Sequence, residues 1–152
     1  MGCLYTKILQ LESTTLECTY KGCTELEEVT AVNATSAPQG FLYNNEKLRR
    51  VILPKLTKPG SYLIRQQGGT YKNLEEIQIG SVGYPVTAIS NLRWRYGAHA
   101  MILNVTIYVD YTSVADIPST ITTNAVGDSM YAPSGSTVNI IWRNSTTGEV
   151  LT

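Results

Sequence analysis

The strongest constraint on the fold is a two-residue alternation that runs from His99 to Thr112. Apolar side chains hold one parity, and polar side chains hold most of the other. The apolar positions are Met101, Leu103, Val105, Ile107, Val109 and Tyr111, and the intervening ones include Asn104, Thr106, Tyr108 and Asp110. Successive side chains of a β-strand point to opposite faces, so this pattern predicts one long strand with a buried apolar face.

Shorter runs of the same kind, separated by turn residues, occur along most of the chain. Gly68-Gly69 predicts a tight hairpin, because glycine accepts the positive φ that such turns require. A loop is expected over 33–40, and residues 149–152 are expected to close a hairpin on the last strand. The expected strands are 4–11, 16–22, 26–32, 62–67, 70–72, 74–79, 86–96, 99–112, 120–123 and 138–143.

Residues 45–53 allow two interpretations. The first is a short helix, with an asparagine of Asn44-Asn45 as its N-cap and Pro54 as the residue that ends it. The second is a hairpin whose arms are 41–43 and 48–53. Both stay open at the level of sequence.

These patterns predict an all-β fold: a single antiparallel β-sandwich domain over 1–152, Ig-like or jelly-roll-like, with one short helix near 45–53 as an option. A barrel is the competing topology. Continuous alternation argues against a doubly wound parallel sheet, whose strands are apolar on both faces. A faint echo relates Leu26-Glu27-Glu28-Val29 to Leu74-Glu75-Glu76-Ile77, but the gaps after the preceding Thr-Tyr-Lys differ, so we expect no repeat.

The composition is globular and electrically balanced. Twelve basic and twelve acidic residues give a formal net charge of +0, so the field that attracts nucleic acid or an anionic membrane is missing. A net charge near zero also leaves self-association unopposed. Ten tyrosines against one phenylalanine suit half-exposed sheet faces and interfaces.

Catalytic equipment is sparse, and we expect no enzyme, no cofactor and no metal. Gly127-Asp128-Ser129 matches an esterase signature, but no histidine follows Ser129 to activate it. The single histidine and three cysteines have no metal-ligand spacing. Cys18 and Cys23 flank a turn and are placed for a bridge, whereas the odd cysteine count and the absence of a signal sequence favour reduced thiols.

Candidate contact residues for a partner or ligand are Arg93, Arg95, Tyr108 and Tyr131. In Arg93-Trp94-Arg95-Tyr96 the arginines share one strand face, so the arginines are expected outside and the aromatics in the core. Glycan binding would need an exposed aromatic such as Trp94, Trp142 or Tyr131. Both tryptophans lie on the apolar parity of their strands, which favours burial.

Two features bear on location. No apolar run is long enough for a transmembrane helix, and the amino terminus lacks a secretory signal, so membrane association is not expected. Met1-Gly2-Cys3 fits the myristoylation pattern with a second acylation site at Cys3. Strand-like sequence begins at Leu4 without a linker, which makes lipidation the less favoured interpretation.

The last third of the chain resembles small β-rich structural proteins of tailed bacteriophages, such as capsid decoration, head-fibre and tail accessory proteins. The resemblance is one of texture, carried by residues 117–124 (I-P-S-T-I-T-T-N) and 134–144 (S-G-S-T-V-N-I-I-W-R-N). It implies a virion component made in the host cytoplasm, without a cofactor, that assembles through sheet edges and tyrosine-rich faces.

The expected function is therefore a non-enzymatic structural protein that docks on a capsid or tail protein as a homo-oligomer. A carbohydrate-binding sandwich and a lipidated membrane protein are the alternatives. The terminal segments 1–11 and 138–152 are the expected contact regions.

Overall fold

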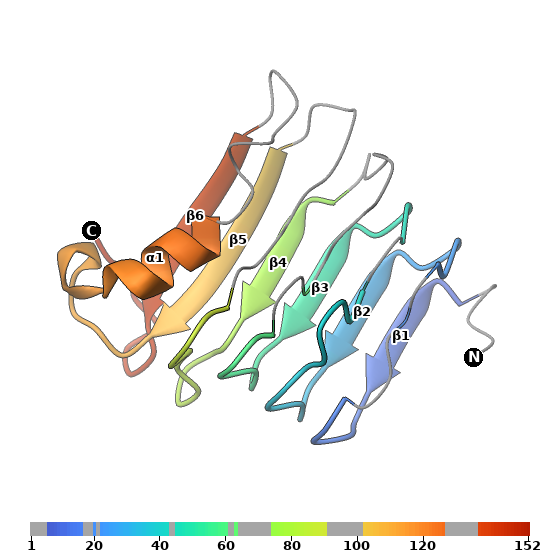
Figure 1. Ribbon diagram of the computed structural model, residues 1–152, viewed down its shortest axis with the longest axis horizontal. Coiled ribbons are helices and arrows are strands. Elements are labelled where there is room, and N and C mark those ends of the chain that lie inside the picture. Colours follow the sequence, from blue (N-terminus) through green and yellow to red (C-terminus); the bar gives the residue numbers. More distant parts are fainter. Residues whose placement is uncertain are drawn as a thin grey trace.

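The computed structural model describes residues 6–16, 20, 22–42, 45–60, 63, 74–90, 102–126 and 137–152. They form one six-stranded sheet in which the strands lie side by side in chain order and every neighbouring pair is parallel (Figure 1). The predicted antiparallel sandwich is therefore wrong. The strands are β1 (Ile8–Leu11), β2 (Glu28–Ala31), β3 (Arg50–Leu53), β4 (Glu76–Ile79), β5 (Ile102–Val109) and β6 (Thr137–Asn144).

The sheet belongs to a solenoid, in which each turn of the chain supplies one strand. One row of register partners shows this directly, because its members come from successive strands at spacings of 20, 22, 26, 28 and 35 residues. The row is Ile8, Glu28, Arg50, Glu76, Asn104 and Asn139. Each connection must return the chain to the start of the next strand, which a parallel neighbour requires.

Further hydrogen bonds join successive turns within the connections. Thr35 N donates to Thr14 O, Thr57 N to Thr35 O and Thr87 N to Thr57 O, at 3.1, 3.4 and 2.9 Å. Deeper in the connections, Leu42 N donates to Leu63 O at 3.0 Å. The turns are therefore stacked by backbone pairing on more than one side.

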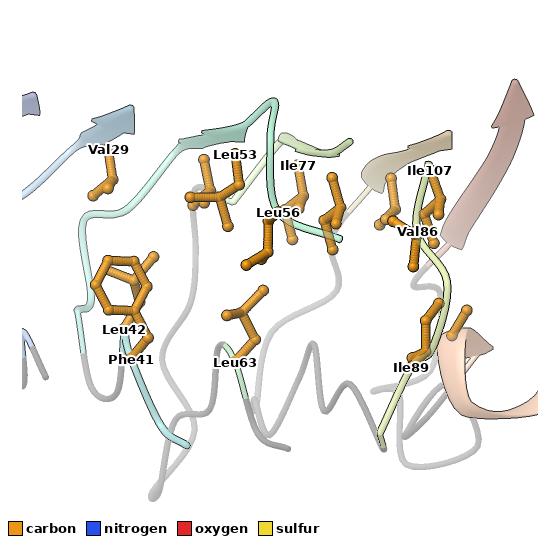
Figure 2. Packing of buried hydrophobic residues seen from close by; sticks show 14 of the residues in the cluster. Val29, Phe41, Leu42, Leu53, Leu56, Leu63, Ile77, Val86, Ile89 and Ile107 are labelled. Carbon is orange, nitrogen blue, oxygen red and sulfur yellow. The ribbon is translucent and has the colours of Figure 1, made fainter. Parts of the chain in front are cut away.

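The core lies between the sheet and its connections. From the strands, Val29, Leu53, Ile77 and Ile107 point toward side chains of the connections, all on the same side of the sheet (Figure 2). The connections contribute fully or almost fully buried apolar residues to the same core: Phe41, Leu42, Leu56, Leu63, Val86 and Ile89. The hydrophobic effect thus acts across one face of the sheet only.

The sequence carries a real repeat, contrary to our expectation. Leu26, Leu48 and Leu74 are buried and stand three residues before Val29, Val51 and Ile77, which are register partners. The two related segments that we attributed to chance therefore occupy equivalent places in the solenoid. The connections vary in length, and this variation hides the equivalence from a comparison of gaps.

The alternation was interpreted correctly for side-chain direction and wrongly for topology. Leu103, Val105, Ile107 and Val109 are all fully buried, so the predicted inward parity of the long strand is confirmed. Alternation reports one buried and one open face. Parallel sheets usually have both faces covered, and we took the open face to mean antiparallel pairing. A solenoid leaves one face of a parallel sheet open.

The short helix near 45–53 is wrong, since residues 50–53 are β3. Asn45 does not cap a helix. It is fully buried and joins two turns of the solenoid: its Oδ1 accepts from Cys23 N and its Nδ2 donates to Tyr20 O, each at 2.8 Å. The competing hairpin over 41–53 is also absent, because β3 pairs with β2 and β4.

The expected strand at 120–123 is a helix, α1 (Ser119–Val126), preceded by the 3-10 turn η1 (Val114–Asp116). Pro118 O accepts the first hydrogen bonds, from Ile121 N and Thr122 N. Ile121 and Ala125 are four residues apart and buried, so they form an inward helical stripe. This burial overrides the strand preference of the threonines.

The other expected strands and loops are partly confirmed. Within the described residues, 26–32, 74–79 and 138–143 contain strands, 33–40 is a loop, and 86–90 is not a strand. The C-terminal hairpin is confirmed: Val150 bridges Arg143 in antiparallel fashion, and Leu151 N donates to Trp142 O at 2.9 Å. The strand expected at 4–11 is present as β1, and its first residues lie outside the described ones. Apart from Leu63, the hairpin expected at 62–72 also falls outside, as does the strand over 91–96.

We predict that Asn45→Ala lowers the free energy of unfolding by about 2–4 kcal/mol, because the buried Cys23 N–H and the partly buried Tyr20 C=O lose their partner. Urea denaturation measures the loss. Glu46→Ala, at the exposed position next to Asn45, serves as the control and should change stability by less than about 0.5 kcal/mol. Equal effects of the two substitutions would contradict the bridging role of Asn45.

Candidate interaction surface

The side of the sheet that faces away from the connections, here called the outer face, is the candidate functional surface. Every second side chain of each strand points to it. Ile8 at one end of the sheet is 59% exposed and Ile102 in β5 is 66% exposed. Among the residues that the structure describes, the connections and α1 lie on the opposite side (Figures 1 and 2).

An uncharged band crosses the middle of the outer face. Its members are register partners, one from each strand, and none carries a charge. They are Gln10, Thr30, Ile52, Gln78, Thr106 and Ile141. The order amide, hydroxyl, aliphatic occurs twice across the six strands, so the uncharged band offers both hydrogen-bonding partners and apolar contact area.

A charged strip runs beside this band, at the beginning of β2, β3 and β4. The sign changes from one turn to the next: Glu28, Arg50 and Glu76 are successive register partners. Arg50 Nε lies 2.9 Å from Glu76 Oε2, and Arg49 Nη2 lies 3.5 Å from Glu75 Oε2. The arginines that precede and begin β3 are thus paired with carboxylates of the next turn.

At the rim of the charged strip, Lys47 Nζ lies 2.8 Å from both carboxylate oxygens of Glu25. These hydrogen bonds are the main cause of a pKa of Glu25 below its usual value. A lowered folded-state pKa means that the pair favours folding above the usual carboxyl pKa, and that this contribution is lost as pH falls through the folded-state pKa. At neutral pH the Glu25 carboxylate is therefore charged and paired with Lys47.

Beyond the charged strip, Asn139 of β6 donates through Nδ2 to Asn104 Oδ1 of β5 at 2.9 Å. The two residues are register partners on the outer face and both are exposed. This uncharged, hydrogen-bonded pair extends the polar part of the outer face to β6, the last strand of the sheet.

Of the predicted contact residues, the structure places Tyr108 on the outer face. It is half-buried in β5, and its Cβ would lie 3.2 Å from a Cβ added to Gly80. Arg93, Arg95 and Tyr131 lie outside the described residues, as does Gly127-Asp128-Ser129. The sequence analysis did not identify Ile52 and Gln78 as members of the outer face. The repeat could have located them, because each stands four residues after a repeated leucine, Leu48 or Leu74.

The structure tests the expectations for one tryptophan and one cysteine. Trp142 is buried, on the inward parity as predicted, whereas Trp94 lies outside the described residues. Cys23 is disulfide-bonded, so the expectation of reduced thiols does not hold for this residue. Cys3 and Cys18 lie outside the described residues.

In the described part of the chain, no group of three or more His, Cys, Asp or Glu residues is placed to hold a metal ion. No helix in that part is long and apolar enough to cross a membrane. A small polar pocket of about 220 Å³ lies at the C-terminal hairpin, lined by residues that include Thr112, Asn144 and Glu149.

Comparison of the chain with protein-family models, with curated proteins and with solved structures found no match.

We predict that the charges of β3 and β4 are coupled in pairs. Arg50→Glu and Glu76→Arg should each destabilise the protein by about 0.2–1 kcal/mol, because each places like charges on neighbouring strands. The double variant restores an opposite-charge pair and should lose less stability than the sum of the singles. Urea denaturation of the four proteins gives the coupling energy, which should shrink at about 1 M salt. Strictly additive effects would contradict the pairing.

Proposed function

We propose that this protein is a non-enzymatic binding module that docks on another protein through the outer face of its solenoid. The observation that supports this most directly is a parallel sheet that, among the described residues, has one face covered by the connections and the other left open. Parallel sheets ordinarily have both faces covered. An open face that spans successive turns is the kind of extended surface that repeat proteins use for binding.

The repeat itself supports this class of protein. Leu26-x-x-Val29-x-Ala31, Leu48-x-x-Val51-x-Leu53 and Leu74-x-x-Ile77-x-Ile79 resemble the L-x-x-L-x-L segment of leucine-rich repeats, which place one strand in each repeat of about 20–29 residues. The spacings of 20, 22, 26 and 28 residues fall in that range. The chain departs from the pattern after this segment, so the resemblance concerns the architecture of the strand side.

The chemistry of the outer face indicates the kind of partner. The uncharged band has no charge to attract a polyanion, and the neighbouring charges are paired within the chain. Ile52 and Ile141 offer apolar area, whereas Gln10, Gln78 and Thr106 offer donors and acceptors. Such a surface fits a protein segment with few charges, bound by hydrogen bonds and apolar contact.

The more specific expectation, a component of a virion, remains a prediction that the fold does not test. Glycan binding is less favoured, because Trp142, one of its candidate aromatic platforms, is buried. We therefore propose docking on a protein and leave the assembly in which it occurs to experiment.

We predict that ligands selected without bias will bind the uncharged band. A random peptide library is panned against the immobilised protein, and the affinities of the recovered peptides are measured by interferometry. Gln78→Arg and Thr106→Arg should each weaken most of these peptides by about tenfold or more, because an arginine blocks the band and introduces an unpaired charge.

The matched controls are Thr35→Arg and Thr87→Arg, which add the same side chain at exposed positions of the connections. They should leave the affinities unchanged within about twofold. Peptides that respond to the control variants and not to the band variants would contradict the proposal. A glycan array that gives specific binders while the peptide library gives none would favour the carbohydrate alternative.

A further inference from the structure

The strand β6 is the last of the sheet, and only part of its outer edge is covered by described residues (Figure 1). The C-terminal residues fold back along its second half: Leu151 N donates to Trp142 O and Asn144 N donates to Glu149 O, both at 2.9 Å. The first half, 137–141, has no such neighbour among the described residues. Within the described part of the chain, β6 is thus an eight-residue edge strand whose first half is unpaired on its outer edge.

The folded-back segment determines what the free half can accept. Continuing the solenoid in register with β1 of another copy would place Ile8–Leu11 beside residues 139–142 of β6, as the rows of the sheet continue. Trp142 O already accepts from Leu151 N, and Val150 bridges Arg143. The C-terminal segment therefore blocks a head-to-tail parallel stack and leaves open a pairing that uses only 137–141.

The free half is self-complementary. An antiparallel pair centred on Asn139 would place Asn139 opposite its own counterpart, Val138 opposite Ile140, and Thr137 opposite Ile141. None of these residues is charged, and the chain has a formal net charge of +0, so neither local nor global repulsion opposes the pairing. Asn139 uses its Nδ2 toward Asn104, and an amide can donate a second hydrogen bond and accept others.

Pairing would also cover apolar surface at the end of the solenoid. Val138 and Ile140 share rows with Leu103 and Val105, which are fully buried, yet they are themselves only half-buried. Among the described residues, no strand follows β6 to cover them. A second copy that adds its own Val138 and Ile140 would extend the core across the junction, and solenoid ends generally require such covering.

We propose that the protein forms a two-fold symmetric dimer in which the β6 strands of two copies pair antiparallel over residues 137–141, centred on Asn139. The contact is isologous, so it closes at two copies. It leaves the outer face of each copy open, and it is independent of the function proposed for that face.

The experiment measures the mass of the full chain by sedimentation equilibrium from about 5 to 500 µM. The wild-type protein should change from 16.7 kDa toward twice that mass and then reach a plateau. An electrophoresis gel without reductant checks that the dimer is not a disulfide-linked species. Asn139→Asp and Asn139→Lys should each weaken the dimer by about fivefold or more, because each places like charges opposite one another.

An equimolar mixture of the two charged variants is the decisive sample. Opposite charges then face each other across the symmetry axis, and the mixture should dimerise more tightly than either variant alone. Asn104→Asp is the matched control: it adds the same carboxylate one strand away from the edge and should leave the dimer intact. Circular dichroism confirms that all variants are folded.

Three results would overturn the proposal. The first is a wild-type mass of 16.7 kDa at every concentration. The second is a dimer that tolerates both charged variants as well as it tolerates the control. The third is a mass that keeps growing with concentration, since this would indicate head-to-tail stacking through β1.

Discussion

Burial on one side of the sheet is the interaction on which the rest of this structure depends. Each strand of the solenoid contributes apolar side chains to a single face, and the connections supply the residues that cover them, such as Leu56, Leu63 and Val86. No second sheet is needed within the described residues. The stacked connections cover this face in place of the second layer of a sandwich, and the described residues leave the other face of the sheet free for contact.

The sequence predicts side-chain direction well and strand direction poorly. Alternation placed Leu103, Val105 and Ile107 inward, and all three are fully buried. The same alternation is compatible with parallel or antiparallel neighbours, because it reports only which face is covered. The information about topology lies in Leu26, Leu48 and Leu74, which recur at equivalent places. Connections of unequal length obscured that recurrence.

Local propensity fails where tertiary contacts decide. Asparagine is a common helix N-cap, but Asn45 binds the backbone of the preceding turn. The threonine-rich segment around Ile121 is a helix because Ile121 and Ala125 are buried. For the candidate surface, Tyr108 was predicted from its polar parity. Ile52 and Gln78 belong to four-residue strands, and their common face becomes visible only when the turns are stacked.

The most direct test of this account is a methyl NOE map of the protein in solution, using residues of one inward row: Val29, Val51, Ile77, Val105 and Ile140. A parallel solenoid predicts strong contacts between each of these residues and its neighbours in the row, since adjacent strands are about 4.8 Å apart. It predicts none between Val29 and Val105, which are separated by two intervening strands. Strong contacts between Val29 and either Val105 or Ile140 would contradict the solenoid and restore a packing of one sheet on another.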